Sequence, residues 1–281
     1  MLGVPASLPA PLDLLELPFM RTAVVELLLL AVAGGLLGAW IVLHRLAFFS
    51  HAVGTATFPG LVVADAARMS PKLAGLAVAA AYAGGVERAG RRDREGGDTA
   101  TGLLLVVALG AGVVLASDVL DSGGVVDRLL FGTLIGLDGG DIAFSAAAAA
   151  LAVGATLALG RAWIALGFEP DAARALGLPA PLAEGLLLGV VAVAVVAALP
   201  AVGALLVTSL FFVPAATGRL LARSVPELLG LSVALAAAEG IAGLYVALWL
   251  DVPPGPAVAT LGATAYGLCA LALVGRRGVQ P

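Results

Sequence analysis

Carboxyl groups inside apolar runs are the strongest chemical signal in this sequence. Glu239 lies within residues 236–242, where every neighbour is alanine, glycine or isoleucine. An ionisable group at such a place is costly in a membrane, and its default role is to face a partner or a water-filled path. The alternative is a protonated carboxyl group bonded to neighbouring backbone. Glu26 and Glu184 lie near the ends of their apolar runs, so we expect both at the membrane surface.

Other residues that could perform chemistry are scarce. Cys269 is the only cysteine, so an intrachain disulfide or a cysteine-ligated metal site is excluded. His44 and His51 are the only histidines, which excludes a histidine-rich metal cluster. Lys72 is the only lysine and follows Ser-Pro, so the GxxxxGK[ST] phosphate-binding loop is missing. We therefore expect no enzyme activity and no permanently bound cofactor; if ATP powers this protein, a partner polypeptide binds and hydrolyses it.

The composition indicates the solvent in which these groups lie. Of the 281 residues, 61% are hydrophobic and only 12% are charged, and the mean hydropathy is +1.08. Soluble domains carry roughly 25% charged residues. These values exclude a soluble enzyme, a nucleic-acid-binding module and a disordered tail. They predict an all-α polytopic membrane protein in which residues 1–281 form a single transmembrane domain.

The elements that must position the polar groups are membrane spans. Crossing about 30 Å of hydrocarbon takes about 20 apolar residues. We predict about nine spans, within a range of 8–10. Pro200 and Gly203 mark the break in the long uncharged stretch after Gly185. The predicted spans are 22–43, 52–67, 73–86, 101–117, 142–160, 184–199, 201–217, 227–250 and 257–274.

Basic residues set the predicted orientation. With nine spans and the N-terminus outside, 11 of the 15 Lys and Arg residues fall in cytoplasmic loops. The outside loops are comparatively acidic. Residues 1–18 are then an extramembrane segment, residues 161–181 a cytoplasmic loop, and the C-terminus is cytoplasmic. Glycines spaced at three or four residues, such as Gly34 and Gly38, predict close helix packing.

The loop between the fifth and sixth spans contains a predicted helix at residues 169–178. Pro170 suits the first turn, Glu169 and Asp171 complement the helix dipole, and Gly177 ends the helix. A capped two-turn helix is more than a connector requires. It is either an incidental loop helix or a lever that docks in a groove of a cytoplasmic partner.

This segment closely resembles the coupling helix in permeases of the zinc/manganese/iron ABC importers, the ABC-3 or zinc-uptake permease family. Further motifs resemble that family's signatures in the same order, and ordered matches are much stronger than any one alone. They are WIVLHRLAFF at 40–49, DTATG at 98–102, LFG at 130–132 with IG at 135–136, GALLV at 203–207 with VPAAT at 213–217, and LDVPPGP at 250–256.

The resemblance implies a bundle like those of vitamin B12 and zinc importer permeases, working as a homodimer in the cell membrane. It implies an importer of zinc or manganese, in which a cytoplasmic ATPase dimer drives alternating access and an extracytoplasmic binding protein delivers the substrate. Residues 169–178 would then contact the ATPase. The implied coupling residues are Glu169, Pro170, Asp171, Ala172, Arg174, Ala175, Leu176 and Gly177.

The substrate pathway departs from the family pattern at the second span. The family usually places Asp and His four residues apart on one helix face. Here His51 stands at the Asp position and Thr55 at the His position. Imidazole and hydroxyl are a weaker divalent-cation site because no ligand charge offsets desolvation. The pathway either uses weaker ligands, or is completed by Glu239, or carries a substrate other than a bare divalent metal.

Three functions thus stay open at the level of sequence. The first is the permease of a zinc or manganese importer, with His51, Thr55 and Glu239 in the pathway and His51 and Glu239 as candidate metal ligands. The second is a permease of the same fold for a non-metal or chelated substrate. The third is a secondary transporter that needs no ATP, which repeats and paired broken helices would indicate; the sequence contains no convincing repeat.

Overall fold

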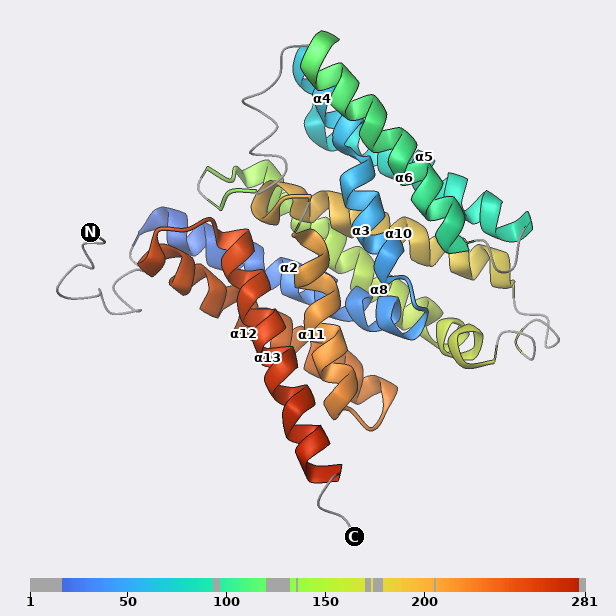
Figure 1. Cartoon of the computed structure of the whole chain (residues 1–281), viewed down its shortest axis with the longest axis vertical. Helices are drawn as coiled ribbons and strands as arrows, with labels where there is room; N and C mark the ends of the chain where they lie inside the picture. Colours follow the sequence, from blue (N-terminus) through green and yellow to red (C-terminus); the bar gives the residue numbers. More distant parts are fainter. Residues whose placement is uncertain are drawn as a thin grey trace.

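The computed structural model describes residues 17–92, 97–119, 132–134, 136–169, 173, 179–204 and 206–277. Within these ranges the chain forms helices and no strand (Figure 1). The helices are α2 (Pro18–Leu43), α3 (Ala47–Ala56), α4 (Phe58–Ala66), α5 (Pro71–Arg92), α6 (Gly97–Val114) with a π-helical turn η1 (Leu115–Val119), α8 (Gly139–Phe168), α10 (Ala180–Val202), α11 (Val207–Leu221), α12 (Val225–Leu250) and α13 (Pro254–Arg277).

Each predicted span coincides with a helical segment. Seven segments in the described chain are long and apolar enough to cross a membrane, with α3 and α4 counted as one broken span, Ala47–Ala66. The other two predicted spans correspond to α5, whose last turns carry charges, and to α11, which has 15 residues. The prediction of an all-α multi-span bundle is confirmed.

The helices form two groups joined by a central pair. One group contains α2, α11, α12 and α13, and the other contains α3, α4, α5 and α6. Helices α8 and α10 pack against each other; α8 contacts α2, and α10 contacts α5 (Figure 1). The predicted close packing is found on α2, where a Cβ added at Gly35 would lie 2.5 Å from the Val233 Cα. Small residues therefore let α12 approach the α2 backbone.

The break predicted at Pro200 and Gly203 is found at Gly203. Helix α10 continues through Pro200 and ends at Val202, with Gly203 at φ +82°. The Gly203 N–H still donates to the Leu199 carbonyl oxygen at 2.9 Å, so proline alone does not end the helix. The left-handed conformation of Gly203 does, because L side chains rarely adopt it. The Pro200 carbonyl accepts a hydrogen bond from Thr133 N–H at 2.8 Å.

The cytoplasmic loop predicted at 161–181 is shorter than expected. Helix α8 continues through residues 161–168, because the first helix-breaking residue is Pro170. Of the predicted coupling segment, Glu169 caps α8 and is exposed, and Ala173 is helical and buried. Residues 170–172 and 174–178 lie outside the described residues, as do residues 1–16 of the predicted N-terminal segment.

Candidate functional site

His51 lies on α3 and faces α11. Its Nδ1 atom is 3.4 Å from the Thr208 Oγ1 atom, and its side chain is half-buried. Gly54 allows this approach, because a Cβ there would lie 3.1 Å from Val207 Cγ1 and 3.3 Å from the Ala204 carbonyl oxygen. The histidine thus lies where the break between α10 and α11 meets the broken second span. Its contact with Thr208 joins residues 157 positions apart.

Thr55 lies one turn after His51, as their spacing of four residues predicts. Its side chain is buried. Its hydroxyl group donates to the His51 carbonyl oxygen at 3.3 Å. Such back-bonding is typical of threonine in apolar helices. The hydroxyl oxygen keeps lone pairs that could contact a cation. The polar side chains at this place are thus an imidazole and two hydroxyl groups: that of Thr208 lies near the His51 ring, and that of Thr55 bonds to the His51 backbone.

Glu239 lies in a different part of the bundle. Its side chain is on α12, only 7% exposed, and directed at α13. A Cβ added at Gly262 would lie 2.7 Å from Glu239 Oε2 and 3.1 Å from Val213 Cγ1, so glycine makes the space that the carboxyl group fills. Glu239 Oε1 is buried without a hydrogen-bond partner.

The structure does not bring Glu239 to the other predicted pathway residues. Helix α11 lies between α3 and α12 (Figure 1). Among the described residues, no hydrogen bond or ion pair joins Glu239 to His51 or Thr55. Nowhere in the described ranges does a group of three or more His, Cys, Asp or Glu side chains lie close enough together to hold a metal ion. In this conformation the carboxylate does not complete the His51 site.

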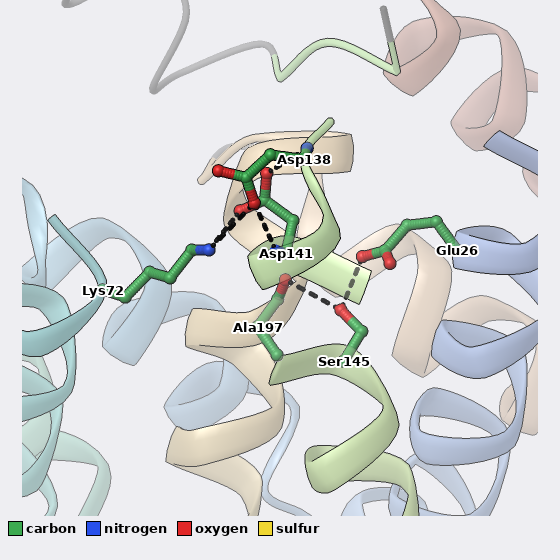
Figure 2. A network of polar contacts seen from close by, with 6 residues as sticks. All are labelled: Glu26, Lys72, Asp138, Asp141, Ser145 and Ala197. Carbon is green, nitrogen blue, oxygen red and sulfur yellow. Dashed lines mark hydrogen bonds and ion pairs between the residues drawn. The ribbon is translucent and has the colours of Figure 1, made fainter. Parts of the chain in front are cut away.

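Glu26 is the polar residue whose packing the sequence did not reveal. We expect it near the membrane surface, and the structure shows that neighbouring helices bury it fully, with 0% exposure. Helix α2 begins at Pro18, so Glu26 lies more than two turns inside it and faces α8. Its Oε1 atom accepts a hydrogen bond from Ser145 Oγ at 2.5 Å, and Oε2 is without a partner (Figure 2).

An ion-pair network lies at the same end of α8. Lys72 Nζ is 2.9 Å from Asp141 Oδ1 and 3.5 Å from Asp138 Oδ1. Asp138 caps α8 by accepting the Asp141 N–H at 2.7 Å, while Asp141 accepts the Asp138 N–H at 2.9 Å. The Asp141 N–H and the Lys72 ammonium hold the pKa of Asp138 below its usual value. Lys72, Asp138 and Asp141 come from two loops that the predicted spans and orientation place outside, and the structure brings them together.

The other histidine has a structural role. His44 Nε2 donates to the Trp163 carbonyl oxygen at 3.0 Å, and Trp163 Nε1 donates to the Ala183 carbonyl oxygen at 2.8 Å. Trp40 Nε1 donates to Thr156 Oγ1 at 3.1 Å. These bonds join α2, α8 and α10 near the predicted cytoplasmic side. His51 is therefore the histidine whose ring makes no hydrogen bond to backbone among the described residues.

Comparison with known proteins decides the family. The model of the ABC 3 transport family matches residues 16–273. The chain belongs to this family. It is 30% identical over 256 residues to a probable metal transport system membrane protein of Thermotoga maritima, covering 90% of each chain. It is 26% identical to the manganese transport system membrane protein MntC of Halalkalibacterium halodurans, with 91% of this chain and 88% of the relative covered.

Solved structures share the fold. The chain matches PsaBC from Streptococcus pneumoniae in complex with Fab with a TM-score of 0.81 and 20% identity, covering 92% of this chain and 93% of the other. It matches an inward-facing metal-chelate type ABC transporter with a TM-score of 0.71 and 17% identity, covering 96% and 91%. The resemblance seen in the sequence motifs is confirmed: this ABC-3 protein is a multi-span membrane permease.

Proposed function

We propose that this ABC-3 permease imports a divalent metal ion, manganese or zinc, through a pathway that passes His51. Manganese is the first substrate to test, because the names of the aligned relatives include manganese transport. The chain would act as a homodimer in the cytoplasmic membrane. An extracytoplasmic protein would deliver the ion, and closure of a cytoplasmic ATPase dimer would bias the permease between outward and inward states.

The contact between His51 and Thr208 carries this proposal. In the described chain, His51 is the one histidine whose ring is not bonded to backbone. The contact places it where the interrupted span α3–α4 meets the start of α11, just after the break that follows α10. Irregular backbone in a membrane is tolerated where it lines a cavity or is buried in protein. Imidazole is a ligand for manganese and zinc, and neutral hydroxyl partners bind loosely. Loose binding suits a pathway that must also release its ion.

Helix α8 supplies a connection between the two membrane surfaces. Its 30 residues rise about 45 Å, enough to cross the whole bilayer. One end carries the Lys72–Asp141 pair, and the other ends at Glu169, where the predicted coupling segment begins. In the proposed orientation, with the N-terminus outside and the C-terminus in the cytoplasm, ATPase closure at residues 169–178 would move α8 as a rigid rod.

Reconstitution tests the class of transporter. The permease is placed in liposomes with its cognate ATPase and binding protein, and uptake of radioactive manganese and zinc is measured. We expect uptake only when ATP is present on the ATPase side. Permease alone should give no uptake above protein-free liposomes. Ion accumulation without ATPase or ATP would instead indicate a secondary transporter.

A chelated metal is the second candidate substrate. The ligands around His51 are neutral, so they offer no charge to a bare divalent ion, whereas a chelator would bring its own donors. One aligned relative, 26% identical, is named a chelated iron transport system membrane protein, from Yersinia pestis. If ATP-driven uptake needs a chelator in the external buffer, this second candidate replaces the first.

A further inference from the structure

We propose that Glu26, Asp141 and Ser145 form a second cation-binding site at the outer end of α8, which the Lys72 ammonium neutralises in this conformation. A hard divalent cation binds there when Lys72 withdraws. The site is distinct from His51, on other helices. It depends on neither the direction of transport nor the identity of the transported ion.

The free oxygen of Glu26 is the first support. Glu26 and Ser145 both have 0% exposure, and their hydrogen bond leaves Glu26 Oε2 with no partner. A buried acceptor without a partner costs about 1–3 kcal/mol. Figure 2 shows the Glu26 carboxyl group, on α2, directed at Ser145 on α8. A cation bound beside Ser145 would satisfy the free oxygen.

The second support is the arrangement along α8. Asp141 and Ser145 are four residues apart and therefore lie on one face, one turn from each other. Ser145 contacts Glu26 and Asp141 contacts Lys72, so this face of α8 lies between the buried carboxyl group and the ammonium group. Two carboxyl groups, those of Asp138 and Asp141, thus contact a single ammonium group, whose side chain is 31% exposed. Acidic charge exceeds basic charge here, and Lys72 sits at the solvent edge of the group.

The donor atoms define the class of cation. They are carboxylate oxygens, the Ser145 hydroxyl oxygen, and the Ala197 carbonyl oxygen, 3.5 Å from Ser145 Oγ. Oxygen donors select hard cations such as manganese, magnesium and calcium over soft ones. Lysine binds as a flexible point charge, so it can leave without disturbing the oxygens.

Lys72 can withdraw because it comes from another part of the bundle. It lies on α5, which packs with α4 and α6, whereas Asp141 lies on α8. Both helices pack against α10, and the ion pair bridges them. A shift of α5 relative to α8 would remove the ammonium group and leave Glu26, Asp141 and Ser145 to a dissolved cation.

Manganese binding to the purified full-length chain tests the proposal. Bound Mn²⁺ is counted by electron paramagnetic resonance in the wild type and in Lys72→Gln. We expect Lys72→Gln to bind one more Mn²⁺ per chain than the wild type, and Lys72→Gln combined with Glu26→Gln to lose it. Lys72→Arg, which keeps the charge, should match the wild type. Arg68→Gln removes a charge from an exposed residue four positions earlier and should also match it.

A second measurement uses the unmutated chain. Because Lys72 is the only lysine, mass spectrometry can follow its acylation by an amine-specific reagent. We expect Mn²⁺ to increase the rate at Lys72 in the wild type, by displacing the ammonium group, but not in Glu26→Gln. No extra Mn²⁺ in Lys72→Gln, or an extra Mn²⁺ that survives Glu26→Gln, would overturn the proposal. Neither readout involves ATP or transport, so failure of the proposed function would not be mistaken for failure of this site.

Discussion

Two buried carboxyl groups, Glu26 and Glu239, have opposite surroundings in this permease. Glu26 receives a hydrogen bond from Ser145 and belongs to a polar group that continues to Lys72. Glu239 fills a space made by Gly262 and has no donor for its buried Oε1. Depth within an apolar run therefore says little about the use of a carboxyl group. The helices that pack against a carboxyl group determine which partners it has.

The largest expected effect concerns the space around Glu239. Gly262→Leu should destabilise the permease by about 3 kcal/mol, because its side chain would overlap both the carboxyl group and Val213. Thermal unfolding in detergent measures the loss. Gly267→Leu is the matched control on α13, where an added Cβ meets nothing within 4 Å. Equal effects of the two changes would show that Gly262 makes no such space.

Replacing Glu26 should have the next largest effect. Glu26→Met fills similar volume but removes the acceptor of the Ser145 hydroxyl group, and should cost about 2 kcal/mol. The same unfolding assay applies. In a double-mutant cycle, Ser145→Ala should recover part of the loss, because in Glu26→Met the Ser145 hydroxyl group keeps only its long contact, 3.5 Å, with the Ala197 carbonyl oxygen. Strictly additive effects would mean that the two side chains are not coupled.

The same change at Glu239 should act in the other direction. Glu239→Met removes a buried oxygen that has no partner, so it should stabilise the permease by about 1 kcal/mol. The sign is the informative result. A loss of stability comparable to that of Glu26→Met would show that Glu239 has a polar partner in the membrane-embedded protein.

The smallest effect is expected at the cap of α8. Asp138 is stabilised in its charged form by the Asp141 N–H and Lys72, so its pKa is lower in the folded protein. Its contribution to stability is therefore present above its ordinary pKa of 3.8 and is lost as the pH falls through the folded value. Unfolding of the wild type and Asp138→Asn should differ slightly near neutral pH and converge in acid. A difference that persists in strong acid would contradict this.

The positions of the helices could be predicted from the sequence better than which side of each helix is buried. Hydropathy predicted the positions of the helices, seven segments of which in the described chain are long and apolar enough to cross a membrane, because run length and polarity alone determine them. It did not predict the burial of Glu26, because that burial depends on which side of α2 meets α8. It placed the break at Pro200 and Gly203, and of these two residues only Gly203 ends the helix. The contact of His51 with Thr208 follows from tertiary packing, which one sequence does not reveal.

The pathway assignment is tested most directly by ATP-driven manganese uptake in three reconstituted permeases: wild type, His51→Ala and Glu239→Gln. Each is first checked for monodispersity and for ATPase assembly. We predict that His51→Ala lowers the initial uptake rate about tenfold, the equivalent of about 1.4 kcal/mol of lost ligand interaction, while Glu239→Gln keeps most of it. Unchanged uptake by His51→Ala together with loss of uptake by Glu239→Gln would contradict a pathway through His51.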